Sequence, residues 1–231
     1  MCGRFSLTDP EALMDRFEIG ETRIGPRYNI APTQDVAVVR KDPQLQKNRL
    51  DLMHWGLVPS WTKNPSSGSR MINARSETVE QKPSFRNAFR SQRCLIPADG
   101  FFEWKKLPGG KYPFYFRLQG GEVFAFAGLW ERWQATASLS LTSCCILTTT
   151  PNDMVAKIHD RMPLLLPREQ ENEWLASKIL PWDQLSRVPL YPDEELEAYP
   201  VSGLVNAVQN DSPELIRPVD LATVVRQRSL F

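Results

Sequence analysis

The sequence predicts an α+β protein in which antiparallel or mixed β-sheets curl into a barrel-like core and helices lie at the periphery. The middle of the chain is rich in aromatic and β-branched residues, which favour strands. Regular βαβ alternation is missing, and so is a Gly-rich phosphate loop, which disfavours the nucleotide-binding α/β folds. The 19 prolines fit a chain with many loops.

Residues 1–92 predict a helix, two strands and a second, short helix. Residues 8–19 read TDPEALMDRFEI, in which Thr8 or Asp9 can cap a helix and Pro10 suits its first turn. The segments that follow are expected as a loop around Pro32 (27–34), two strands (35–40 and 49–55), a loop (64–70) and a short basic helix (83–92).

The rest of the chain supplies most of the predicted strands, because its aromatic and β-branched runs are the longest. We expect strands at 93–104, 112–118, 122–133 and 143–150, and helices at 151–158 and 167–177. The sequence after Val201 is expected to be rich in loops. We expect one domain over residues 1–220 and a C-terminal tail over residues 221–231.

Charge is balanced overall but uneven along the chain. Lys and Arg total 28 against 27 Asp and Glu. Residues 61–117 contain eleven basic and four acidic residues, and residues 168–220 reverse this balance with four basic and eleven acidic ones. The basic part can present a surface to polyanions, or the pattern can be an ordinary solvated surface; charge alone leaves both open.

The cysteines and histidines predict neither a metal site nor a cofactor. Four cysteines, at positions 2, 94, 144 and 145, lack the spacing of metal ligands, and the chain has only two histidines. Arg4 follows closely on Met1 without an apolar segment, and no apolar run is long enough to span a bilayer. We therefore expect a cytoplasmic protein with reduced thiols.

Cys2 is the first candidate for chemistry. Cysteine is small enough for removal of the preceding Met1 by methionine aminopeptidase, which would leave an α-amine and a thiol on adjacent carbons. A neutral amine attacks an aldehyde to give an imine, and the thiol then closes a five-membered thiazolidine ring, with both nucleophiles held on one residue. The alternative is an ordinary second residue in a frayed terminus.

Such a reaction needs groups that transfer protons, and two candidates are Glu103 and His159. Glu103 lies in the aromatic segment GFFEW, where an inward orientation would raise its pKa, although it could instead pair with Lys105 or Arg93 on the surface. His159 lies in IHDRM and could equally be a structural histidine.

The segment MINARSETV places Asn73, Arg75 and Glu77 at alternating positions. In a strand this spacing puts all three side chains on one face. Asn can orient a nucleophile and Arg can hold a phosphate, while an ordinary polar strand face explains the same pattern.

Seven motifs in order resemble the SRAP family of abasic-site processing proteins, over nearly the whole chain from Met1 to about Pro218. They are MCGRF, RYNIAPTQ, HWGLVPSW, INARSET, RCLIPADGFFEWKK, IHDRMPLLL and VSGLVNAVQNDSPELI. The resemblance implies an SRAP-like fold. It also implies that Cys2 forms a thiazolidine crosslink with the ring-opened aldehyde of an abasic site in single-stranded DNA, and that Asn73, Glu103 and His159 line the site.

This chemistry suggests a role for each group. Glu103 would take a proton from the Cys2 amine, His159 would act as general acid and base on the sugar oxygen, and Asn73 would hold the amine or a substrate oxygen. The expected partner is an abasic single strand, or a single-strand/duplex junction, in a bacterial nucleoid at replication forks. The residues expected to contact DNA are Arg4, Pro32, Trp61, Arg75, Trp104, Thr148 and Arg161.

The last five residues, QRSLF, resemble the pentapeptide that binds the bacterial sliding clamp. Gln227, Leu230 and Phe231 match its pocket-filling positions, and Arg228 stands where Leu is usual. A frayed tail is the alternative.

Two other functions fit parts of the sequence. A non-covalent single-strand binder would use the basic part and the tryptophans without Cys2. A thiol peptidase would use Cys2 and His159 on a peptide substrate.

Overall fold

The protein is described here by a computed structural model that covers residues 2–176 and 188–228. Its centre is a closed ring of five strands, which confirms the predicted barrel-like core. The ring runs β10–β4–β3–β6–β9 and back to β10; only the β4–β10 pairing is parallel. These strands span Asp35–Lys41 (β3), Asn48–Trp55 (β4), Arg93–Ala98 (β6), Phe124–Gln134 (β9) and Ser140–Thr149 (β10).

Three short strands extend the barrel wall. β5 (Asn73–Arg75) lies parallel to β10, and β11 (Met162–Pro163) pairs antiparallel with the same strand. β12 (Leu165–Leu166) pairs with β9. The end of β10 therefore carries β5 and β11 side by side with it.

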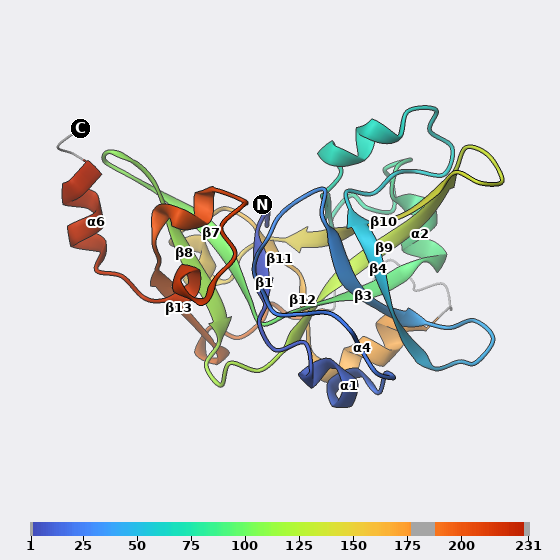
Figure 1. Cartoon of the computed structure of the whole chain (residues 1–231), viewed down its shortest axis with the longest axis horizontal. Coiled ribbons are helices and arrows are strands. Elements are labelled where there is room, and N and C mark those ends of the chain that lie inside the picture. Colours follow the sequence, from blue (N-terminus) through green and yellow to red (C-terminus); the bar gives the residue numbers. More distant parts are fainter. Residues whose placement is uncertain (1, 177–187, 229–231) are drawn as a thin grey trace.

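A second, fully antiparallel sheet has the order β13–β8–β7–β1–β2. Its strands span Phe5–Leu7 (β1), Arg27–Ile30 (β2), Gly100–Leu107 (β7), Gly110–Leu118 (β8) and Leu196–Pro200 (β13). Figure 1 shows this sheet beside the barrel, with the start of the chain between the two. Strand β1 thus brings the N-terminal residues to the junction of both sheets.

Helices lie at the periphery, as predicted (Figure 1). They are α1 (Ala12–Phe17), α2 (Arg86–Ser91), α3 (Asp153–Ala156), α4 (Arg168–Leu175) and α6 (Leu221–Arg228). Short 3₁₀ helices lie at η1 (Pro65–Arg70), η2 (Asp193–Glu195), η3 (Gly203–Asn206) and η4 (Pro213–Ile216). None of the helices in the described part of the chain has the length and apolar character needed to cross a membrane.

Strand β7 is buried on both faces, and this orients the residues of the predicted site. Phe101 stacks on Phe116, at 4.9 Å between ring centroids, in the main core that fills the barrel side. Phe102 points the other way, into a smaller cluster with Tyr115 and Val205. Since side chains alternate along a strand, Glu103 returns to the face of Phe101 and points toward the barrel.

Two predicted segments differ from the structure. Residues 27–34 are not a loop throughout: Arg27–Ile30 forms β2, because its backbone pairs with β1 near the N-terminus. The predicted strand over residues 93–104 is two strands in two sheets. The chain breaks at Asp99, whose carboxylate accepts hydrogen bonds from the Ser6 hydroxyl at 2.6 Å and from the backbone of Thr8.

Other differences are smaller. Residues 65–70 form a 3₁₀ turn, since the Asn64 side chain accepts a hydrogen bond from the Ser66 backbone N–H at 3.0 Å. The expected polar strand around Asn73 ends at Arg75, so Glu77 lies in the following turn and not on the strand. The sequence after Val201 contains helix α6 in addition to turns and loops.

Candidate active site

The structure brings Cys2, Asn73, Glu103 and His159 together from four separate segments. The Asn73 amide (Nδ2) donates to the Cys2 carbonyl at 2.7 Å, and His159 Nε2 lies 3.8 Å from Glu103 Oε2. The charge of Glu103 raises the pKa of the Cys2 thiol, in addition to the larger effect of burial. The four side chains therefore share one site at the junction of the two sheets.

The N-terminal strand fixes Cys2 in this site. Phe5 pairs with Phe101, and the Phe102 backbone N–H donates to the Arg4 carbonyl at 3.0 Å. The Cys2 thiol in turn lies 3.9 Å from the same carbonyl. The ladder between β1 and β7 thus carries Cys2 to the part of the sheet that presents Glu103.

Asn73 offers both halves of its amide to the site. Strand β5 is held parallel to β10, with Asn73 opposite Ile146, so the side chain is fixed by the barrel wall. Its nitrogen holds the Cys2 carbonyl. Its Oδ1 atom is buried and accepts no hydrogen bond from any residue in the described part of the chain. This oxygen is placed to accept from an amine or a hydroxyl at the Cys2 terminus.

Glu103 is a buried carboxyl group with 2% of its surface exposed. Burial raises its pKa to about 7, and the charge of Asp160 adds to that shift. A carboxyl group with such a pKa can both accept and release protons near neutral pH. The alternative of a surface ion pair is wrong, since Glu103 is buried and Arg93 donates instead to the carbonyls of Trp174 and Phe89.

His159 is oriented by the loop between α3 and β11. Nδ1 lies 3.0 Å from the Arg161 backbone nitrogen and 3.2 Å from the Arg161 carbonyl oxygen, and Nε2 lies 3.8 Å from Glu103 Oε2. Burial lowers the pKa of His159, partly offset by exposed Asp160, whose carboxylate lies 3.1 Å from Nδ1. The ring is therefore held with Nε2 near the Glu103 carboxyl group.

The Cys2 thiol is fully buried, and burial raises its pKa. At neutral pH it is therefore held as the neutral thiol and is a poor nucleophile by itself. No group of three or more His, Cys, Asp or Glu side chains in the described residues is arranged to hold a metal ion.

The predicted phosphate contacts fall into two groups. Arg161 and Thr148 are occupied within the protein: Arg161 forms a two-pronged ion pair with Glu77, at 2.6 and 2.9 Å, and donates to the Thr148 carbonyl at 2.7 Å, and Thr148 is fully buried. Arg75 is exposed, and Arg4 is partly exposed. These two arginines therefore have side-chain surface open to solvent.

The aromatic candidates also differ from one another. Trp61 is 61% exposed, as a base-stacking residue requires. Trp104 packs beside the smaller hydrophobic cluster, and its indole N–H donates to the Asn206 side chain at 2.8 Å. Pro32 is partly buried in the turn after β2.

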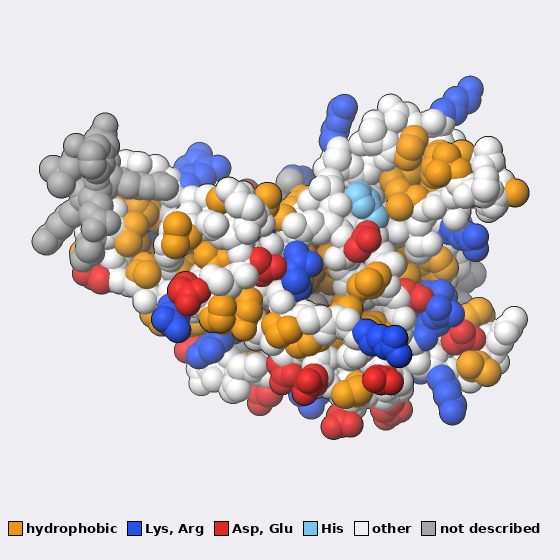
Figure 2. Space-filling model, in the orientation of Figure 1, with side chains coloured by type: hydrophobic (Ala, Val, Ile, Leu, Met, Phe, Trp, Pro, Cys, Tyr) orange, Lys and Arg blue, Asp and Glu red, His pale blue; other side chains and the backbone are white. Residues whose placement is uncertain are grey.

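Charged side chains of both signs are spread over the face of the molecule that Figure 2 shows. In Figure 2, Lys and Arg side chains stand along the upper edge of the molecule, on both sides of the place where the chain begins. Asp and Glu side chains gather along the lower edge.

Most of the residues predicted to bind the sliding clamp lie beyond the part of the chain that the structure describes. Leu230 and Phe231 lie outside the described residues, and only the backbone of Gln227 is placed, in α6. Sequence reasoning also missed Asn29, a fully buried polar residue that contacts Arg4. The one sequence signal for Asn29 was an amide side chain between Tyr28 and Ile30 in a predicted loop.

Comparison with known proteins shows which family this chain belongs to. Residues 1–208 match the family described as SOS response associated peptidase (SRAP). The abasic site processing protein YoqW of Bacillus subtilis is 45% identical over 223 residues, which cover 94% of this chain and 99% of YoqW. The abasic site processing protein YedK of Escherichia coli is 31% identical, over 95% of this chain and all of YedK. The abasic site processing protein HMCES of Gallus gallus is 30% identical, over 87% of this chain and 68% of HMCES.

Solved structures share the fold. A crystal structure of a Bacteroides thetaiotaomicron protein superposes with a TM-score of 0.83 at 22% identity, covering 95% of this chain and all of the other. A Bordetella bronchiseptica protein superposes with a TM-score of 0.72 at 27% identity, over 87% of this chain and all of the other.

Proposed function

Because this chain belongs to the SRAP family, we propose that it processes abasic sites in DNA by joining to them through Cys2. The observation that carries the proposal is the convergence of a buried Cys2 with an amide, a carboxyl group of raised pKa and an imidazole. The relatives are named as abasic site processing proteins, which supports the same substrate. The product is a stable DNA–protein crosslink that shields the damaged strand.

The reaction proceeds in two bond-forming steps. The neutral α-amine of Cys2 attacks the aldehyde carbon of the ring-opened sugar, and the resulting carbinolamine loses water to give an imine. The Cys2 sulfur then adds to the imine carbon, and the thiol proton is transferred to the nitrogen. The carbon gains one bond to nitrogen and one to sulfur, one water leaves, and no oxidant or reductant is needed.

Each polar group has a role in this sequence. Glu103, with a pKa of about 7, takes a proton from the amine, whose reference pKa is about 7.7–8.0. His159 donates from Nε2 to the oxygen that leaves as water. Asn73 holds the Cys2 backbone through its carbonyl, and its free Oδ1 accepts from the amine.

The raised pKa of the Cys2 thiol fits this order of steps. A thiol peptidase needs a thiolate for its first attack, and burial of Cys2 opposes thiolate formation. In the crosslinking reaction the amine attacks first, and the thiol reacts afterwards with an activated imine carbon at close range. The peptidase alternative is therefore the weaker one.

The amine exists only after Met1 has been removed, since the Cys2 nitrogen is otherwise part of a peptide bond. Cysteine at position 2 is small enough for methionine aminopeptidase. The processed protein acts on abasic single strands and on single-strand/duplex junctions, in the cytoplasm at replication forks. Arg4, Arg75 and Trp61 contact the strand.

The experiment mixes processed protein with a single-stranded oligonucleotide that carries one abasic site, followed by a denaturing gel. A band that migrates more slowly is expected, and it should be lost with Cys2→Ala or with an oligonucleotide whose sugar aldehyde has been reduced. Cys145→Ala removes another buried thiol and should keep the band. A band that forms equally well without the aldehyde would contradict the proposal.

A second candidate is non-covalent binding of single strands, favoured by the exposed Trp61 and the basic edge of the molecule. It predicts salt-dependent binding that is indifferent to Cys2. Binding of undamaged and abasic strands with equal affinity, and with no denaturant-stable band, would favour this candidate.

We also propose that Gln227, Leu230 and Phe231 bind the bacterial sliding clamp. Clamp should be retained by the full-length chain and lost when residues 227–231 are deleted. Equal retention by both chains would end this proposal.

A further inference from the structure

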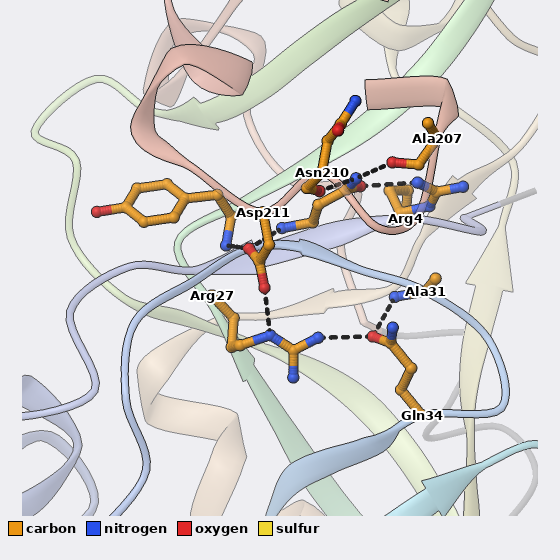
Figure 3. A network of polar contacts seen from close by, with 9 residues as sticks. Arg4, Arg27, Ala31, Gln34, Ala207, Asn210 and Asp211 are labelled. Atoms are coloured by element: carbon orange, nitrogen blue, oxygen red, sulfur yellow. Dashed lines mark hydrogen bonds and ion pairs between the residues drawn. The ribbon is translucent and has the colours of Figure 1, made fainter. Parts of the chain in front are cut away.

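We propose that Asn29 is a positioning residue that holds Arg4 ready for a phosphate group of the bound DNA strand. The inference rests on the proposed function, because it assigns a DNA contact to the same site. It concerns a polar network that joins β2 to the segment 205–211, next to Cys2 (Figure 3).

Asn29 is a fully buried hub of this network. Its Nδ2 donates to the carbonyls of Asn210 at 2.6 Å, Ala207 at 3.1 Å and Val205 at 3.3 Å. Its Oδ1 accepts from Arg4 Nη1 at 2.7 Å, and the same Arg4 nitrogen donates to the Val205 carbonyl at 2.7 Å. One buried amide therefore fixes the 205–210 segment and Arg4 at the same time.

Asp211 fixes the backbone of Asn29 and of its neighbour Tyr28. Its carboxylate accepts from the backbone N–H groups of Tyr28 and Asn29, at 2.5 and 3.1 Å, and from Arg27 Nε at 2.6 Å. Arg27 continues to Gln34, whose side-chain oxygen also accepts from the Ala31 backbone N–H. Figure 3 shows these groups as one connected set.

Arg4 is held only by neutral oxygens, and this distinguishes it from the other arginines of the region. Within residues 2–176 and 188–228, no carboxylate forms an ion pair with Arg4. Arg161 is neutralised by Glu77, and Arg27 by Asp211. The positive charge of Arg4, two residues from Cys2, is therefore uncompensated and available to an anion.

The fixed side chain explains why the network matters for binding. An Arg side chain loses rotamer entropy when it is immobilised. Asn29 and the Val205 carbonyl hold one guanidinium nitrogen before DNA arrives. In Figure 3 another nitrogen of the Arg4 guanidinium points away from the network. A phosphate contact of this kind fixes the position of the strand without reading its sequence.

The test measures the salt dependence of non-covalent binding in the Cys2→Ala background, with the full chain and an abasic single strand. For single strands the slope of log K against log salt is about −0.7 for each phosphate contact. Arg4→Gln should lower its magnitude by about 0.7 and weaken binding about tenfold. Asn29→Ala and Asn29→Asp should give the same loss, the second because a carboxylate would neutralise Arg4.

Combined variants separate positioning from simple destabilisation. Adding Asn29→Asp to Arg4→Gln should cause no further change in the slope, because the contact is already absent. Asn48→Ala is a matched control that removes an amide donor to the Phe17 carbonyl, and it should keep the wild-type slope. A wild-type slope in folded Asn29 variants, or a second equal loss in the double variant, would overturn the inference.

Asp211→Asn covers the case in which neither Asn29 variant folds. The variant keeps an oxygen for the backbone N–H groups of Tyr28 and Asn29 and weakens the contact of residue 211 with β2. It should slow crosslinking severalfold when Arg4 is present. In the Arg4→Gln background it should not slow crosslinking at all. Equal slowing in both backgrounds, or no slowing, would overturn the inference. If wild-type protein neither binds nor crosslinks abasic strands, the proposed function itself fails, which is a different result.

Discussion

Glu103 Oε2 lies 3.8 Å from His159 Nε2, too far for a direct hydrogen bond and close enough for one oxygen atom to contact both. An oxygen about 2.8 Å from each atom would form a hydrogen-bonded triangle with them. In the proposed reaction that oxygen is the one that leaves the sugar carbon as water. The carboxyl group and the imidazole would then act on one atom from two sides.

Glu103→Gln should slow crosslink formation about 100-fold near neutral pH, because the amide cannot take the amine proton. The wild-type rate should rise with pH through about 7, where Glu103 becomes ionised, and the variant should lack this rise. Single-turnover rates from pH 5.5 to 8.5 measure both effects. A variant with the wild-type pH profile would remove Glu103 from the role of base.

The same carboxyl group affects stability. Its pKa is about 7 in the folded protein and near 4.5 when exposed, so the folded state binds more protons between these values. Stability therefore falls as pH rises from about 4.5 to above 7. Glu103→Gln should unfold at a higher temperature than wild type at pH 8, with a smaller difference at pH 5. Glu122→Gln, which changes an exposed glutamate, is the control. If both variants changed the unfolding temperature equally at the two pH values, the burial of Glu103 would be contradicted.

His159→Ala should slow formation and reversal of the crosslink by similar factors, of about 100-fold, since the same group serves the same step in both directions. Reversal is measured by transfer of the protein to a second abasic oligonucleotide of different length. Loss of formation with wild-type reversal would show that His159 only supports the structure of the loop.

Glu77→Gln should strengthen DNA binding. It releases Arg161 from its ion pair and adds one available cation, so the salt slope should steepen by about 0.7. Asp51→Asn removes the shared partner of Arg40 and Arg49 on strands β3 and β4 and serves as the control, for which no change is expected. An unchanged slope for Glu77→Gln would mean that Arg161 does not reach a phosphate.

Local sequence patterns predicted the parts of the site that depend on neighbouring residues. Glu103 stood out as a carboxyl group in an aromatic strand, and the structure confirms its burial. The alternation of Asn73 and Arg75 predicted a strand, which exists as β5. The seven motifs predicted the family, which the comparisons confirm.

Features that depend on distant partners were not predictable in the same way. Residues 27–30 form a strand only because β1 lies beside them, and the partners of Asn29 are carbonyls 176 to 181 residues away. Glu77, the ion-pair partner of Arg161, lies 84 residues away, and nothing near Arg161 in the sequence indicates it. Long-range pairings of this kind are set by the packing of the two sheets.

Intact mass after mixing with an abasic oligonucleotide tests the central claim most directly. Processed protein should gain the mass of the oligonucleotide less one water, while a chain that retains Met1 and a Cys2→Ala chain should gain nothing. The account would be contradicted if the processed protein gained no mass, or if the chain without the Cys2 thiol gained as much.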